Sequence, residues 1–155
     1  MSEDFHQKMV LKYGNQKYLQ NNWQYKKSRK KTKLIYGVGI NDVEFSVQPN
    51  INGKQLKHTA YQVWSDMLQR AYSDRYKSTR PTYIGVTVVN EWKTFSTFLS
   101  WFNNHYIPGF ALDKDILIEG NKIYGPKSCI FVPASINSFL TLHNSDRGAY
   151  SIGVS

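Results

Sequence analysis

The sequence predicts an α+β fold with small antiparallel strands, two amphipathic helices and a strand–loop–strand–helix (ββα) unit near the C-terminal end. Short β-prone runs bounded by turn residues alternate with two segments in which apolar residues recur every three or four positions. With 155 residues, 41% of them hydrophobic, the chain is long enough for one domain with a real core. We expect that domain at residues 34–144, after a basic arm at 1–33 and before a tail at 145–155.

The arm is polar and ends in a run of cations. The run at residues 26–33 contains Lys26, Lys27, Arg29, Lys30, Lys31 and Lys33. Such a run neutralises phosphates and gives affinity for nucleic acid without sequence specificity. The whole chain has a net charge of +9, which also favours a polyanionic partner. A solvated tail is the alternative explanation for the run.

The first half of the domain predicts a hairpin and then a helix. Residues 34–38 and 43–47 are β-prone runs separated by turn residues. From Thr59 onward one helical face is apolar; its members are Ala60, Val63, Trp64, Met67, Leu68 and Ala71. Cations gather at the end of this helix and beyond it: Arg70, Arg75, Lys77 and Arg80. They could contact phosphates, although complementing the helix dipole is a simpler explanation for Arg70.

A second helix follows a β-prone run at residues 83–89. Asn90 is a favourable capping residue, so we expect the helix to begin there. Its apolar stripe consists of Trp92, Phe95, Phe98, Leu99 and Phe102. We expect these aromatic side chains in the core, and Pro108 and Gly109 to turn the chain after the helix.

The ββα unit is predicted from two β-prone runs, at residues 112–118 and 129–132, that flank a loop rich in Gly and Asn. Pro133 then opens a helix. On a regular strand Asp113 and Asp115 would share one face, with Lys114 on the other, so both carboxylates could bind one cation. A salt bridge of these carboxylates with Lys114 or Lys122 is the alternative.

Several stretches between residues 61 and 137, about half of the chain, carry a family resemblance. Residues 61–72 fit Tyr-x-x-Trp-x-x-Met-x-x-Arg-Cys-Tyr with Ala71 in place of Cys, and residues 83–88 fit Tyr-x-Gly-x-x-Val, followed by Trp92 and Phe95. The remaining stretches are residues 112–115, 120–126, 129–133 and 136–137. Together they resemble the HNH (ββα-metal, His-Me finger) endonucleases of bacteriophages, including homing-endonuclease relatives, with a degenerate HNH motif.

This resemblance implies metal-dependent hydrolysis of DNA phosphodiester bonds with Mg²⁺ or Mn²⁺. It makes Asp113 and Asn137 metal-ligand positions, with Asp115 as a third candidate, and Asn121 the central Asn of the motif. Lys114 stands where the family has its general base, so the catalytic candidates are Asp113, Lys114 and Asn121. An ammonium with a usual pKa of about 10.4 is a poor base. Lys114 or Lys122 could instead stabilise charge on the phosphate.

The identity of the base stays open in the sequence. His58, His105 and His143 could serve only through tertiary contact, and each is more often an ordinary surface or capping residue. At the C-terminus, residues 147–154 are similar to a stretch that leads into an AP2-like DNA-binding domain in family members. We therefore expect the tail at 145–155 to be the truncated start of such a domain.

Three functions follow as hypotheses. The first is a phage-encoded Mg²⁺-dependent endonuclease or nickase that acts on duplex DNA in the cytoplasm of the host cell. The second is a catalytically inactive HNH scaffold that binds nucleic acid or inhibits a host protein. The third is an RNA-binding protein that stacks Tyr and Trp on bases. The single Cys129 indicates neither a disulfide nor a structural zinc site, and no segment indicates secretion or membrane insertion.

Overall fold

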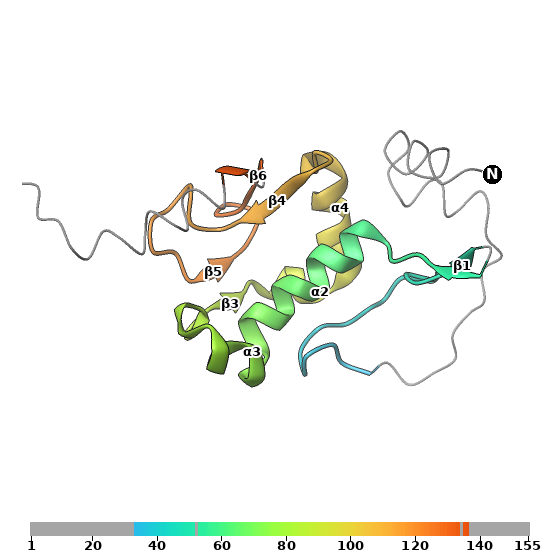
Figure 1. Ribbon diagram of the computed structural model, residues 1–155, viewed down its shortest axis with the longest axis horizontal. Helices are drawn as coiled ribbons and strands as arrows, with labels where there is room; N and C mark the ends of the chain where they lie inside the picture. Colours follow the sequence, from blue (N-terminus) through green and yellow to red (C-terminus); the bar gives the residue numbers. More distant parts are fainter. Residues whose placement is uncertain (1–32, 52, 134, 137–155) are drawn as a thin grey trace, which may run out of the picture.

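The computed structural model of the protein describes residues 33–51, 53–133 and 135–136 (Figure 1). Within these ranges it has a mixed α+β architecture of three helices and small two-stranded sheets, which confirms the predicted class. The helices are α2 (Thr59–Tyr72), α3 (Asp74–Thr79) and α4 (Phe95–His105). The predictions for residues 1–32, Asn137, His143 and the tail at 145–155 lie outside the described residues.

The sheets pair strands that are two to four residues long. Antiparallel pairs form between β1 (Asn50–Ile51) and β2 (Lys54–Gln55), and between β4 (Phe110–Asp113) and β6 (Ile130–Pro133). A parallel pair joins β3 (Thr87–Val88) to β5 (Ile123–Tyr124). The prediction of antiparallel strands alone is therefore wrong for β3 and β5, because β3 is followed by α4 and β4, and the chain returns beside it in the same direction.

Helix α2 begins at Thr59 as its apolar periodicity predicted, and its buried face carries Trp64, Met67 and Leu68. It ends at Tyr72 because Ser73 has extended backbone angles (φ −87°, ψ 114°). The Ser73 hydroxyl then accepts a hydrogen bond from the Tyr76 N–H and caps α3. Helix α3 and β3 therefore lie at the same end of α2 (Figure 1).

Helix α4 begins later than predicted. Asn90 starts a 3-10 turn, Asn90–Lys93, and the α-helix begins at Phe95 after an extended Thr94. The start is fixed by a segment distant in sequence, since the Phe95 N–H donates to the Ile40 carbonyl at 2.9 Å. The Asp42 carboxylate accepts from the Ser96 N–H at 2.9 Å and from its hydroxyl at 2.5 Å. Asp42, rather than Asn90, thus supplies the side chain that satisfies the helix N-terminus.

The predicted hairpin at residues 34–38 and 43–47 does not form. Ile35 and Gly39 make only an isolated bridge, and Ile40 bridges to Thr94 instead of to the second run. In residues 41–50 partly buried and exposed side chains alternate, and Val43, Phe45 and Val47 pack on the core. The period of two therefore marks an extended segment that lies on the core with its apolar side chains facing inward. At its end, Asn50 pairs with Gln55 in the sheet of β1 and β2.

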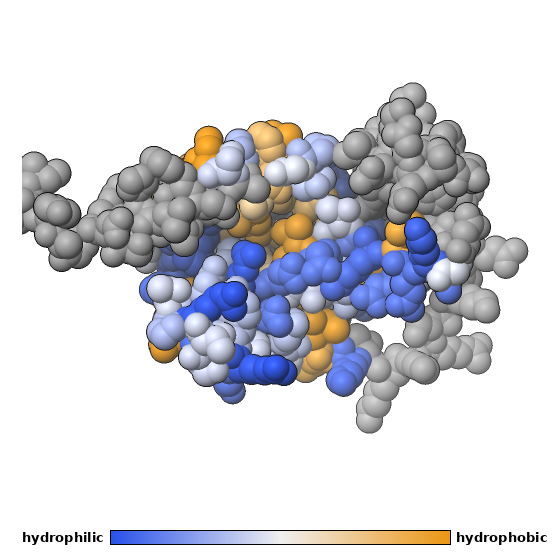
Figure 2. Space-filling view, in the orientation of Figure 1, coloured by the Kyte–Doolittle hydropathy of each residue, from blue (hydrophilic) through white to orange (hydrophobic). Residues whose placement is uncertain are grey.

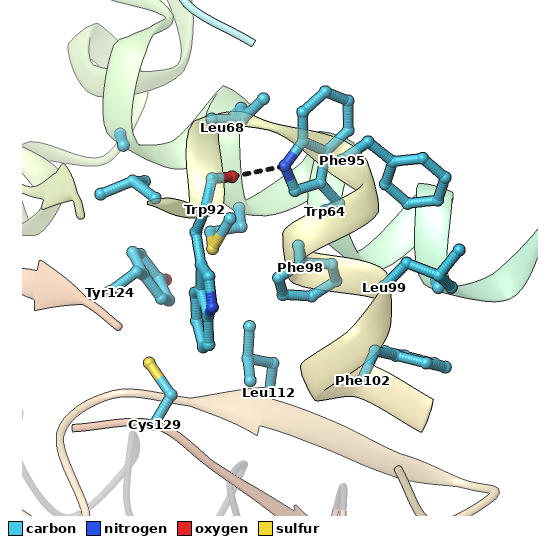
Figure 3. Close-up of a cluster of buried hydrophobic side chains, with 14 of the residues drawn as sticks. Trp64, Leu68, Trp92, Phe95, Phe98, Leu99, Phe102, Leu112, Tyr124 and Cys129 are labelled. Atoms are coloured by element: carbon cyan, nitrogen blue, oxygen red, sulfur yellow. Dashed lines mark hydrogen bonds between the residues drawn. The ribbon is translucent and has the colours of Figure 1, made fainter. Parts of the chain in front are cut away.

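The core lies between α2, α4 and the sheet of β4 and β6 (Figure 3). All predicted aromatic residues of the α4 region that point inward are buried there: Trp92, Phe95, Phe98 and Phe102. The Trp64 indole N–H donates to the Trp92 carbonyl at 2.6 Å, which satisfies a polar atom inside the core. A side chain at Gly39 would press its Cβ against Leu68 and Trp64 in the core, so this close approach favours glycine.

The first strand of the predicted ββα unit is shifted toward the N-terminus. The prediction placed it at residues 112–118, whereas β4 ends at Asp113 and residues 114–118 leave the sheet. Strand β6 pairs with β4 from Phe110 opposite Pro133 to Asp113 opposite Ile130. Of the helix predicted after Pro133, only Ser135 and Ile136 are described, and both are helical. None of the helices in the described ranges is long and apolar enough to cross a membrane.

Candidate functional site

The predicted catalytic residues gather at the end of β4 and in the loop of residues 114–122 that leads to β5. Lys114 is the unusual member, because its side chain is only 8% exposed although it carries an ammonium group. The ammonium nitrogen lies 2.6 Å and 2.7 Å from the two Asp115 carboxylate oxygens. It also donates to the Asn121 carbonyl oxygen at 2.8 Å. The three N–H groups of Lys114 thus have three oxygen acceptors.

Asn121 closes the same loop from the other side. Its amide nitrogen donates to the Lys114 carbonyl at 2.9 Å and to the Ile123 carbonyl at 2.7 Å. Its amide oxygen accepts from the Ile123 N–H at 3.1 Å. The Asn121 side chain therefore fixes the path of the loop into β5, which is a positioning role.

Asp113 shapes the beginning of the loop. One carboxylate oxygen accepts the N–H of Asp115 at 2.7 Å and that of Ile116 at 2.8 Å. A carboxylate that accepts the N–H two residues on forms an Asx turn, which ends the strand. This turn explains why Asp115 does not share a strand face with Asp113, and why Lys114 and Asp115 meet instead of facing opposite sides.

The described residues do not fit the metal ion that the family resemblance implies. The Asp115 carboxylate is bound to an ammonium, and one Asp113 oxygen is bound to two N–H groups. No group of three or more His, Cys, Asp or Glu side chains in the described ranges could hold a metal together. Asn137, the third candidate ligand, lies outside the described residues. Mg²⁺ or Mn²⁺ binding, with Asp113, Asp115 and Asn137 as ligands, stays a prediction.

The two histidines in the described residues, His58 and His105, make other contacts than those expected of a general base at this loop. His58 is 3% exposed and packs between Phe45, at a ring distance of 5.4 Å, and Phe95, at 6.0 Å. Burial lowers the His58 pKa to about 4. His105 is exposed at the end of α4, and its ring nitrogen bonds to the Trp101 carbonyl. Both have local structural roles, and the identity of a base stays open.

Cys129 lies buried beneath the loop. Its thiol is 3.4 Å from the Gly125 N–H, which donates to the sulfur. Burial raises the thiol pKa to about 11, so the thiol stays protonated at neutral pH. Its place between β5 and β6 is a packing position.

Arg70 was predicted as a phosphate contact, and the structure gives it a second environment. The residue is half-buried, and its guanidinium hydrogen-bonds the Tyr124 side chain. Burial alone would lower its pKa, but the oxygens of Tyr124 and Tyr83 outweigh that effect and raise it. Arg70 therefore joins α2 to β5 through Tyr124, which is itself buried.

The other cations of the predicted interface lie on and after α3, where Arg75 and Arg80 are exposed and Lys77 is partly buried. Arg75, Lys77 and Arg80 belong to this segment, and the Arg80 guanidinium lies 4.7 Å from the centre of the Tyr76 ring. Lys122 joins them from the loop before β5, because its ammonium donates to the Thr82 carbonyl at 2.7 Å. Figure 2 shows hydrophilic side chains gathered over α2 and α3 on the viewed face. Two predicted groups thus meet at one region.

Sequence reasoning missed the tyrosines of this region. Tyr76 and Tyr83 contact each other edge to face at 5.4 Å. Tyr83 and Tyr124 both raise the pKa of Arg70, and burial raises the pKa of each tyrosine. Tyr83 and Tyr124 stand next to turns in the sequence, and no periodicity there indicated that they would meet. Only tertiary structure brings them to Arg70.

The charge is unevenly divided along the chain. Residues 1–32 carry eight lysines and arginines and two acidic residues, a net charge of +6. Residues 33–136 carry eleven lysines and arginines and eight acidic residues, a net charge of +3. Lys33, the last cation of the run at residues 26–33, is exposed, and the other five cations of that run lie outside the described residues. The net positive charge of residues 33–136 is therefore small, and their attraction for a polyanion would depend on how closely the cations lie together.

No protein-family model, curated protein or solved structure matches the chain. The resemblance to phage HNH proteins accordingly stays a prediction based on the motifs of residues 61–137.

Proposed function

We propose that the chain is a nucleic-acid-binding protein, built on an HNH-like scaffold, that binds duplex DNA and does not cleave it. One observation carries the second half of this proposal. Lys114, which the resemblance places at the position of the general base, is buried, and its three N–H groups are bound to Asp115 and Asn121. A protonated, paired ammonium cannot take a proton from water. Lys114, at the position of the general base, therefore stabilises the loop instead of activating water.

The cations on and near α3 support the first half of the proposal. Arg75 and Lys77 lie on α3, Arg80 directly follows it, and Lys122 contacts the turn at Pro81–Tyr83 that comes next. Cations in such a group bind phosphates and release counterions, which gives affinity that falls steeply with salt. The six cations at residues 26–33 would add to this affinity, with contacts to the backbone and none to base edges. The expected binding is therefore broad in sequence.

Metal-dependent cleavage is the second candidate, and the antiparallel pairing of β4 and β6 favours it. The four-residue register brings the end of β4 beside the start of β6. Asp113, partly exposed, lies at this edge, and Asn121 holds the following loop in place. The activity would need Asn137 beside Asp113, Mg²⁺ or Mn²⁺, and a base from elsewhere in the chain.

Binding and cleavage can be measured on the same DNA. Supercoiled plasmid is incubated with the full chain in Mg²⁺, Mn²⁺ or EDTA, and the products are separated before and after protein removal. We expect a mobility shift in all three conditions and intact supercoiled plasmid after deproteinisation. Nicked or linear plasmid that depends on metal, and that Asp113→Ala and Asn137→Ala both lose, would establish the endonuclease instead.

The kind of ligand needs a separate comparison. Labelled duplex DNA, single-stranded DNA and duplex RNA of one sequence are titrated with protein at several salt concentrations. The proposal expects the tightest binding to duplex DNA, with a strong salt dependence. Preference for RNA would favour base stacking by aromatic side chains. Absence of binding to all three at low salt would contradict nucleic-acid binding and leave a host protein as the alternative partner.

A further inference from the structure

The Lys114 ammonium lies inside a set of oxygens that would suit a metal ion. Two of them belong to the Asp115 carboxylate, and the third is the main-chain carbonyl oxygen of Asn121. Carboxylate and carbonyl oxygens supplied by one short loop are the ligands that Ca²⁺, Mn²⁺ and Mg²⁺ take in proteins. A compact ammonium is also a cation, and here it has contacts of 2.6–2.8 Å with all three oxygens. The cation that these three oxygens bind is thus a side chain of the protein and not a bound metal ion.

The surroundings indicate that the charge is needed. The loop brings Asp113, Asp115 and Glu119 into one stretch of seven residues, in which Lys114 is the single cation. The Lys114 side chain is 8% exposed, whereas that of Asp115 is 47% exposed. A fixed charge therefore lies on the protein side of the carboxylate, and water reaches the other side. Removal of the ammonium would leave the carboxylate and the Asn121 carbonyl without their shared partner, which is costly for partly buried polar groups.

We propose that the Lys114 ammonium is a built-in substitute for a divalent cation, which makes the loop of residues 114–121 independent of metal. Its removal would open a cation site formed by the Asp115 carboxylate and the Asn121 carbonyl, with water completing the coordination. Ca²⁺ and Mn²⁺ are the ions of choice, because they accept mixed oxygen ligands and flexible geometry. This inference concerns the loop alone and does not depend on whether the chain binds nucleic acid.

The test compares the full chain, without an affinity tag, with its Lys114→Ala variant. Thermal unfolding is followed in EDTA and in increasing CaCl₂ or MnCl₂, with circular dichroism to check folding. The wild-type melting temperature should be the same in EDTA and in cation. Lys114→Ala should melt lower in EDTA and recover by about 5 °C at saturating cation, since an ion that binds only the folded state stabilises it. Mn²⁺ binding should appear as a loss of the free-ion electron paramagnetic resonance signal.

Two controls locate the effect. Lys127→Ala removes an exposed lysine from the neighbouring turn and should behave like wild type in every cation. The double variant Lys114→Ala/Asp115→Asn removes the proposed ligand and should lose the response of the single variant. Retention of the response in the double variant would overturn the assignment of the site.

The remaining outcomes also decide the proposal. If Lys114→Ala does not fold in EDTA, it should fold when refolded in CaCl₂, and failure in both conditions would contradict the proposal. A folded Lys114→Ala that binds no Mn²⁺ would contradict it as well. Saturable Mn²⁺ binding by the wild-type chain that Asp115→Asn abolishes would show that the lysine does not replace a metal.

Discussion

Lys114 and Asn121 hold their loop in both directions. The Lys114 ammonium donates to the main-chain oxygen of Asn121 at 2.8 Å, and the Asn121 amide donates to the main-chain oxygen of Lys114 at 2.9 Å. Each side chain therefore satisfies the backbone of the other residue. The two residues, which the family resemblance makes catalytic candidates, thus organise the same loop.

Asn121→Asp should destabilise the protein more than Asn121→Ala. Alanine removes three hydrogen bonds, which we expect to lower the free energy of unfolding by about 1–3 kcal/mol. Aspartate also places an acceptor against the Lys114 and Ile123 carbonyl oxygens, which repel it. Urea unfolding of both variants measures the difference. Asn104→Ala, an exposed position on α4, is the matched control and should change stability by less than about 0.5 kcal/mol. Equal stability of all three variants would show that the hydrogen bonds of the Asn121 side chain contribute nothing to stability.

The sequence predicted the parts of this fold that depend on local pattern. Helix α2 and the buried stripe of α4 follow from apolar residues at helical spacing, and the α+β class follows from their mixture with β-prone runs. The Asx turn at Asp113 was missed because strand periodicity in residues 112–118 competes with a side chain that bonds its own backbone. No local signal could show that choice.

Contacts between distant segments were beyond sequence reasoning for a different reason. The start of α4 depends on Ile40 and Asp42, which lie about 54 residues before the helix. These contacts outweigh the local preference of Asn90 for a capping position. The same holds for Arg70 and Tyr124, which only the packing of β5 on α2 brings together. At the candidate site, the sequence placed a loop before β5 but began it after residue 118, whereas the chain leaves β4 after Asp113. The partners of Lys114 could be found only in the three-dimensional structure.

Acid should destabilise the protein through His58. Its pKa is lowered by burial to about 4 in the folded state, against about 6.5 when unfolded, so the unfolded chain binds the proton first. Stability contributed by the neutral ring is complete above pH 6.5 and falls as the pH is lowered toward 4, by about 3 kcal/mol. Unfolding free energies measured from pH 7 to pH 4 should show this slope.

His58→Phe isolates the contribution, because phenylalanine keeps the ring between Phe45 and Phe95 and does not titrate. The difference between wild-type and variant curves should be constant above pH 6.5 and should grow in favour of the variant below it. Parallel curves over the whole range would show that His58 titrates normally in the folded state.

Asp42→Ala should weaken the start of α4. The Asp42 carboxylate binds the Ser96 N–H and hydroxyl, and a negative charge there also favours the helix dipole. We expect the free energy of unfolding to fall by about 1 kcal/mol. Glu44→Ala removes an exposed carboxylate two residues away and is the control. Thermal unfolding of the two variants side by side measures the effect, and an equal melting temperature would contradict the capping role.

Arg70 and Arg75 should differ in what they contribute, although both were predicted to bind nucleic acid. Arg75 is exposed on α3, so Arg75→Ala should weaken binding to duplex DNA and reduce the dependence of affinity on salt by about one phosphate contact. Its stability should stay within about 0.5 kcal/mol of wild type. Arg70 is half-buried against Tyr124, so Arg70→Ala should destabilise the fold by about 1–3 kcal/mol.

Two measurements on the same preparations decide between these roles: urea unfolding, and titration of labelled duplex DNA at several salt concentrations. Tyr124→Phe adds a matched test for Arg70, because it removes the hydroxyl and keeps the buried ring. It should lower stability in the same direction as Arg70→Ala, and the double variant should cost less than the sum of the two single changes, since both break one contact. Additive costs would separate Arg70 from Tyr124. A loss of DNA affinity in Arg70→Ala, with stability unchanged, would show that Arg70 contacts the DNA and would contradict its structural role.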